Sequence, residues 1–204
     1  RFMIKSNRWE LSIHKDFIFP NPKSLNSNSM IILDFETNST NEHDVIEAAA
    51  VKIELINNEW VAKELFHRYY LSRYPVNRYS YEVHKLTPEL ILEVRKGCNY
   101  ASYFKEDEEF VEFCSGSGTL IAHNISFELR HLRNIINFRK TFCTMKENKH
   151  VVKATNKNGQ IKNPTLDEVC YYYGIEFDEN KHHSATYDVS KTFEIIKRMK
   201  LCPL

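Results

Sequence analysis

Two acidic residues at the end of an apolar run are the first candidates for chemistry. Residues 30–33 are apolar and lead directly into Asp34 and Glu36. Such a run is typical of a short buried strand, and side chains two positions apart on a strand point to the same face. The two carboxylates would repel each other there unless a cation lay between them, and hard divalent cations bind oxygen ligands. The pair is therefore either part of a metal site or a solvated strand end.

Three further residues lie near the starts of predicted helices, which would meet at one edge of a sheet. Glu128 falls in the first turns of a helix that follows the apolar run 119–123. Asp188 falls in the first turn of the last helix, five residues after His183. Open α/β sheets carry their ligand sites at such an edge, so four carboxylates and one histidine would converge there. An aspartate in the first turn of a helix is also a common partner of the helix dipole, which leaves a structural role for Asp188 open.

The elements that must position these residues follow from hydrophobic periodicity and from turn and cap residues. Strands are expected over residues 30–36, 45–55, 61–71 and 119–123, with a hairpin turn at 57–59. Helices are expected from Thr87, over 103–113 with a solvated acidic face, from 124, from 164 to near 174, and after Ser184. A further strand before residue 164 is left open. This alternation predicts one α/β domain around a mixed sheet over residues 30–204, preceded by an N-terminal extension over residues 1–29.

Taken together and in order, these motifs resemble the DEDDh group of 3′-to-5′ exonucleases. That group includes the epsilon proofreading subunit of bacterial DNA polymerase III, RNase T and the oligoribonucleases. Its first motif, Asp-x-Glu-Thr, matches residues 34–37, and its third, a histidine five residues before an aspartate, matches His183 and Asp188. Its second, His-Asn-x-x-Phe-Asp, is similar to residues 123–128, and a weaker His-x-Leu/Ile-Thr feature matches residues 84–87. The resemblance covers residues 30–200.

Two positions define the resemblance more closely. Glu128 stands where the family usually has aspartate, so its carboxylate is one methylene farther from the backbone. Ser184 stands where the tyrosine subgroup of the family has tyrosine, which favours the histidine subgroup. His182 competes with His183 for the third motif, and the spacing favours His183.

The resemblance implies an RNase H-like α/β fold and two-metal hydrolysis from the 3′ end of DNA or RNA, releasing nucleoside 5′-monophosphates. It implies that His183 is the general base and that two Mg²⁺ ions, replaceable by Mn²⁺, are bound. The implied metal ligands, which are also catalytic, are Asp34, Glu36, Glu128 and Asp188. The implied substrate-binding residues are Thr37, His84, Asn124 and Phe127.

Several of these residues have a second interpretation. His84 either lines the nucleotide pocket or is an ordinary surface residue. His123 and Asn124 either contact substrate or fix the geometry of their loop by hydrogen bonds. A basic stretch is either a solvated loop or a phosphate-binding flank. Its members are Arg139, Lys140, Lys146, Lys149, Lys153, Lys157 and Lys162, with Glu147 as the only acid among them.

Composition narrows the classes of protein. The formal net charge of +1 gives no global preference for a charged partner. The five scattered cysteines form no zinc or disulfide pattern and indicate free thiols in a reducing compartment. No apolar run approaches the roughly 18 residues of a membrane span, and no signal peptide is visible. We therefore expect a cytoplasmic protein with no membrane partner. The resemblance implies that its partner is DNA or RNA with a 3′ end, in single-stranded form.

Two other functions remain as alternatives to the enzyme. The chain could be a catalytically weak RNase H-like module that binds nucleic acid or docks on a polymerase, and Glu128 is the feature in its favour. It could also be an interaction domain in which the N-terminal extension matters most. The presence of both Asp34 and His183 argues for the enzyme, because a binding module needs neither.

Overall fold

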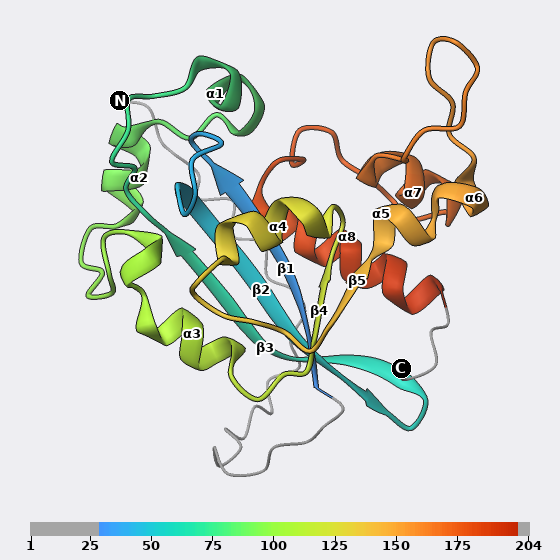
Figure 1. Cartoon of the computed structure of the whole chain (residues 1–204), viewed down its shortest axis with the longest axis horizontal. Helices are drawn as coiled ribbons and strands as arrows, with labels where there is room; N and C mark the ends of the chain where they lie inside the picture. Colours follow the sequence, from blue (N-terminus) through green and yellow to red (C-terminus); the bar gives the residue numbers. More distant parts are fainter. Residues whose placement is uncertain (1–28, 200–204) are drawn as a thin grey trace.

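The computed structural model describes residues 29–199 and is built around a mixed sheet of five strands (Figure 1). The strand order is β3-β2-β1-β4-β5. β4 pairs parallel with β1 and β5 parallel with β4, whereas β2 pairs antiparallel with β1 and β3 antiparallel with β2. The strands are β1 (Met30–Thr37), β2 (Val45–Ile56), β3 (Glu59–Tyr69), β4 (Thr119–Ala122) and β5 (Lys140–Cys143). The strand left open before residue 164 is therefore present as β5. Apart from Ser29, the predicted N-terminal extension lies outside the described residues.

Helices cover both faces of this sheet (Figure 1). They are α1 (Arg78–His84), α2 (Pro88–Val94), α3 (Glu108–Cys114), α4 (Ile125–Leu132), α5 (Thr144–Glu147), α6 (Lys149–Val152), α7 (Leu166–Tyr172) and α8 (Ala185–Arg198). Ile31, Leu33 and Phe35 of β1 pack in one core with α3 and α4. Met30 and Ile32 pack in a second core with α8. Because side chains alternate along a strand, Asp34 and Glu36 lie on the face that α8 covers.

Local signals account for most of the element boundaries. Asn57 and Asn58 both have positive φ, at 52° and 65°, which matches the twist of a tight hairpin turn between β2 and β3. Thr87 caps α2 by accepting a hydrogen bond from the backbone N–H of Leu90 at 3.1 Å. Thr165 begins α7 with a capping box that Glu168 completes. The predicted hairpin and both predicted helix starts are thus confirmed.

The helix predicted over residues 103–113 is wrong in its first half. A single 3₁₀ turn, Phe104–Glu106, comes first, and α3 begins only at Glu108. Asp107 lies between them and accepts from the backbone N–H of Phe110 at 3.2 Å. Its side chain is buried, with 4% exposed, so the predicted solvated acidic face does not include Asp107. The helix breaks here because Asp107 turns inward toward its own partners.

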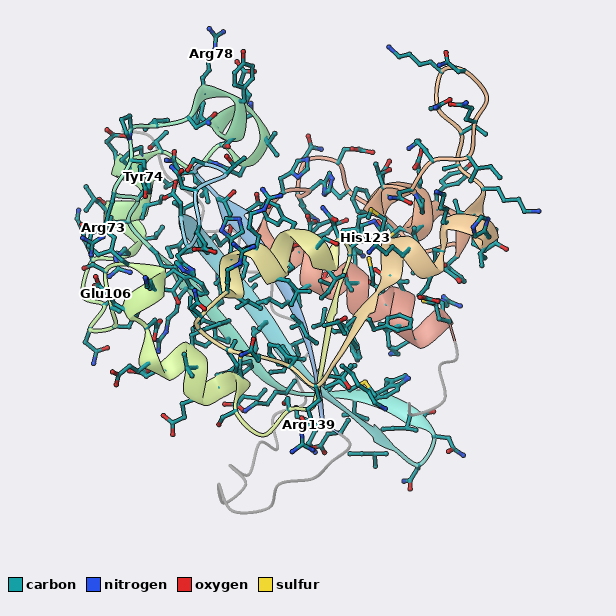
Figure 2. The ribbon with its side chains drawn as sticks, in the orientation of Figure 1. Arg73, Tyr74, Arg78, Glu106, His123 and Arg139 are labelled. Carbon is teal, nitrogen blue, oxygen red and sulfur yellow. The ribbon has the colours of Figure 1, made fainter. Side chains whose placement is uncertain are left out.

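The basic stretch is also differently arranged from a single solvated loop. Its first part forms β5, α5 and α6, and only the segment after Val152 is irregular. That segment folds back on itself through a bridge between Thr155 and Ile161. Arg139 precedes β5 and lies at the end of the short β4–β5 pair opposite to His123 (Figure 2), so it stands apart from the basic residues that follow β5. Within residues 29–199, no helix is both long and apolar enough to cross a bilayer.

Candidate active site

Three of the predicted acidic residues meet where β1 ends. Asp34 and Glu36 come from β1, and Asp188 comes from the first turn of α8. One carboxylate oxygen from each of them lies within 4.8 Å of the others. Glu36 and Asp188 are buried, while Asp34 keeps part of its side chain exposed. The alternation of β1 and the packing of α8 against the same face together produce this group.

Glu128 approaches from the other layer of the molecule. It lies in the first turn of α4, and only 3% of its surface is exposed. Within the described part of the chain, its buried oxygen Oε2 has no hydrogen-bond partner. Glu128 does not belong to the tight group of three, but it is close enough to Asp34 to act on its ionisation. The structure therefore places the predicted fourth carboxylate beside the group rather than within it.

Burial and like-charged neighbours make these carboxylates hard to ionise. Burial, followed by the charges of Asp188 and Glu128, raises the pKa of Asp34 well above its usual value. Burial and then the charge of Glu47 raise the pKa of Glu36 in the same way. Burial also raises the pKa of Glu128, partly offset by the backbone amide of Phe35. Like charges held together in this way favour a bound cation.

Two adjacent histidines border the group at Asp188. The rings of His182 and His183 stack at a centroid distance of 3.6 Å, and Nδ1 of His182 lies 3.1 Å from Oδ1 of Asp188. Burial alone would lower the pKa of His182, but this hydrogen bond and the charge of Asp188 raise it overall. Burial, and then the neighbouring His182, lower the pKa of His183. The His183 ring is therefore more easily neutral than the His182 ring, although both lie beside the carboxylate of Asp188.

His84 is not an ordinary surface residue. It ends α1 with 9% of its surface exposed, and its Nδ1 accepts from the backbone N–H of Leu86 at 2.9 Å. Its Nε2 is buried and has no hydrogen-bond partner in the described residues. Burial lowers the pKa of His84, while the charge of Glu47 opposes that effect. The unpartnered nitrogen therefore belongs to a neutral ring that stands close to the acidic residues.

The second motif divides into structural and accessible residues. Both ring nitrogens of His123 are bonded, Nδ1 to Oγ1 of Thr144 at 3.0 Å and Nε2 to the carbonyl of Pro164 at 3.1 Å. Burial lowers the pKa of His123 to about 4, so this ring fixes the loop. Asn124 is exposed. Phe127 is partly buried against the core that contains α3 and α4.

Thr37 ends β1 next to the acidic residues and is buried, with 8% exposed. Sequence analysis did not identify a further buried carboxylate, that of Glu47 on β2. It stands opposite Glu36 in the pairing of β1 with β2, and 1% of its surface is exposed. Glu47 is one of two acids inside the apolar run 45–55, the other being Glu54. The sequence cannot tell which of them is buried without the register.

Comparisons with known proteins agree with this arrangement. The family model for the RNase T exonucleases, described as "Exonuclease", matches residues 31–196. Exonuclease X, solved with 5′-overhanging duplex DNA, aligns with a TM-score of 0.55 and 17% identity over 82% of this chain and 89% of that one. E. coli exonuclease I, solved with a dT13 oligonucleotide, aligns with a TM-score of 0.65 and 14% identity over 85% of this chain and 41% of that one. A product-bound exonuclease I aligns with a TM-score of 0.64 and 16% identity over 86% of this chain and 44% of that one.

These likenesses confirm the predicted RNase H-like α/β fold. This chain spans less than half of the exonuclease I chains that it matches, at 41% and 44%. No curated protein sequence matches this chain.

Proposed function

Because this chain belongs to the RNase T exonuclease family, of the DEDDh type, we propose that it is a metal-dependent 3′-to-5′ exonuclease. It would release nucleoside 5′-monophosphates from the 3′ end of DNA or RNA. One observation carries the proposal: Asp34 and Glu36 of β1 and Asp188 of α8 lie together in a largely buried position, and one oxygen of each lies within 4.8 Å of the others. Burying several carboxylates is costly unless they bind a cation, so the arrangement supports a metal site.

The donor atoms suit a hard divalent cation. Carboxylate oxygens are the ligands that Mg²⁺ prefers, and Mg²⁺ accepts a few carboxylates together with substrate phosphate and water. Asp34, at the centre of the group, would hold two cations, with Glu36 and Asp188 completing one position. Glu128 would serve the other through its unpartnered Oε2. When bound, the cations would stabilise the charge on the attacking and leaving oxygens of an in-line phosphoryl displacement.

His183 is the general base of this proposal. Its lowered pKa keeps a neutral imidazole available near neutral pH, and a neutral ring can take a proton from water. His182 has the complementary role, because its Nδ1 donates to Oδ1 of Asp188 and orients that carboxylate. The sequence spacing and the two opposite pKa shifts support the same assignment of the pair.

The remaining predicted residues would hold the substrate end. His84 offers a buried, unpartnered Nε2 beside the acidic group, and Thr37 follows Glu36 directly. Asn124 is exposed at the start of α4, and Phe127 contributes partly buried apolar surface. The related exonuclease I structures contain single-stranded oligonucleotides such as dT13, which supports a single-stranded substrate here.

Digestion of end-labelled substrates tests the proposal. Single-stranded DNA and RNA, each labelled at the 3′ or the 5′ end, are incubated with Mg²⁺, with Mn²⁺ and with excess chelator. We expect immediate release of the 3′ label as a mononucleotide, a shortening ladder from the 5′-labelled strand, and no reaction with chelator. Activity that survives the chelator would contradict the metal site. Tight binding of every substrate without cleavage would instead identify a binding module.

A further inference from the structure

Glu47 places a buried carboxylate where it should destabilise the fold, which suggests that it has a role in the acidic site. It is paired directly opposite Glu36 across β1 and β2, and directly opposed residues point to the same face with their Cβ atoms about 5 Å apart. Like charges in such a pair are destabilising. The carboxylate is almost completely buried, with 1% exposed, so solvent does not relieve the repulsion. Local conflicts of this kind in a folded protein are expected at functional sites.

The strand on the other side of Glu47 holds its carboxylate in place. Nε2 of His67 on β3 lies 2.8 Å from Oε1 of Glu47. Tyr69, which pairs with Glu47 in the ladder, turns its hydroxyl to the same carboxylate. The rings of His67 and Tyr69 touch edge to face at 4.8 Å, so the two donors support each other. These contacts fix the Glu47 carboxylate between the donors of β3 and its opposed residue Glu36.

We propose that Glu47 is a positioning residue of the metal site, held by His67 and Tyr69, that turns the Glu36 carboxylate toward Asp34 and Asp188 and strengthens the binding of divalent cations. The inference rests on the proposed function. Glu47 acts through Glu36, because its Oε1 is bonded to His67 of β3 and its carboxylate does not belong to the converging group. Partners of this kind behind a metal ligand usually change metal affinity by about 10- to 100-fold.

Mn²⁺ binding to the metal-free protein tests this role without any cleavage. The signal of free Mn²⁺ in electron paramagnetic resonance gives the affinity of each variant. We expect Glu47→Gln, which keeps the shape but removes the charge, to weaken Mn²⁺ binding about 10-fold. His67→Gln, at the protein surface, should weaken it less. Glu54→Gln is the matched control on the same strand, because Glu54 lies near Lys63, at 3.9 Å, and away from the site.

Thermal unfolding in chelator separates positioning from simple structural support. Glu47→Gln removes a repulsion, so we expect its metal-free melting temperature to equal or exceed that of the wild type, while its shift on adding Mg²⁺ becomes smaller. With saturating Mg²⁺, cleavage by Glu47→Gln should recover to within a few-fold of wild type, because its defect is in affinity. If Glu47→Gln fails to fold, the Mn²⁺ affinity of His67→Gln decides.

The outcomes are distinguishable from failure of the proposed function. Wild-type affinity for Mn²⁺ in both Glu47→Gln and His67→Gln would overturn the inference alone. A lower metal-free melting temperature with unchanged Mn²⁺ affinity would make Glu47 a structural residue and would also overturn it. Wild-type protein that binds no Mn²⁺ would overturn the metal site itself, and the inference with it.

Discussion

Two regions of this molecule bury carboxylates, and they treat them in opposite ways. Asp107, before α3, accepts from Nη1 of Arg68 with both oxygens at 2.8 Å and from the hydroxyl of Tyr70 at 2.7 Å. At the end of β1, Asp34 and Glu36 lie among other acids, and their pKa values are raised well above the usual range. In the first region, side chains of the protein pair with the carboxylate of Asp107. In the second region, acidic side chains outnumber the groups that could pair with them.

This difference separates a structural carboxylate from a functional one. A buried charge is tolerated when it is paired and hydrogen-bonded, which is the situation of Asp107. The group at the end of β1 contains buried charge whose partner is not a side chain, and convergent oxygens suit a divalent cation. Substitutions in the two regions should therefore affect different properties, namely stability for Asp107 and activity for the β1 group.

The largest effect is expected from Asp34→Asn. Loss of the central carboxylate should remove several kcal/mol of charge stabilisation from the reaction, which corresponds to a loss of about 10³-fold or more in rate. The fold should persist, because the substitution relieves repulsion. Cleavage assays and circular dichroism measure the two properties. Retention of more than a tenth of wild-type activity would mean that the site has been misplaced.

The adjacent histidines should differ in effect. His183→Ala should lower the cleavage rate by about 10²- to 10⁴-fold, as expected for loss of a general base. His182→Ala should reduce it much less and mainly at low metal concentration, because His182 orients Asp188. Rates measured across a Mg²⁺ titration separate the two effects. The reverse order of severity would assign the base to His182.

Asp107→Asn should affect stability and leave the chemistry intact. It removes one partner of a buried ion pair, a change that commonly costs 3–5 kcal/mol. We expect about 3 kcal/mol, because Glu109 also pairs with Arg68 and remains. Urea unfolding gives the stability, and cleavage under native conditions gives the activity. A stable but inactive Asp107→Asn variant would erase the distinction between the two regions.

The pH dependence of metal-free stability should sharpen the comparison. The pKa of Asp34 is higher in the folded protein than in the unfolded chain. As pH rises past the unfolded value, the unfolded state releases its proton first, and folding stability falls until the folded pKa is passed. Asp34→Asn lacks this loss, so its stability advantage in chelator should grow with pH. Parallel curves from about pH 5 to about pH 8 would contradict the burial of charge at Asp34.

Much of the site could be predicted because it depends on local patterns. The alternation of β1 puts Asp34 and Glu36 on one face, and a helix start puts Asp188 in a first turn, so neighbouring residues decide both placements. The cap at Thr87 and the turn at Asn57 were predictable for the same reason.

The unpredicted features depend on partners far along the chain. Asp107 turns inward because of Arg68 and Tyr70, about forty positions earlier. Glu47 belongs to the site through the register that sets it between Glu36 and Tyr69. Hydrophobic periodicity cannot reveal either interaction, because it indicates which face of an element a residue occupies and not which residue lies opposite.

The same contrast between paired and unpaired charge predicts which lysines bind phosphate. Lys162 lies 2.6 Å from Glu168, whereas Lys157 is exposed and makes no ion pair with any residue in the described range. Both belong to the irregular segment before Pro164, whose carbonyl is bonded to Nε2 of His123 in the second motif. A lysine releases counterions from the nucleic acid when it neutralises a phosphate. Lys162 already neutralises a carboxylate, so only Lys157 should contribute to the salt dependence of nucleic-acid binding.

Binding measured by fluorescence anisotropy in the Asp34→Asn background, which prevents cleavage, tests this difference. Lys157→Ala should reduce the slope of log affinity against log salt by about 0.7, the value for one phosphate contact on a single strand. Lys162→Ala should change the slope little. Arg139→Ala is the control, because Arg139 lies outside the irregular segment, just before β5 and at the end of the short β4–β5 pair opposite to His123 (Figure 2). Equal slopes for Lys157→Ala and Arg139→Ala would make the segment a solvated loop, and the nucleic acid would then have to follow another face.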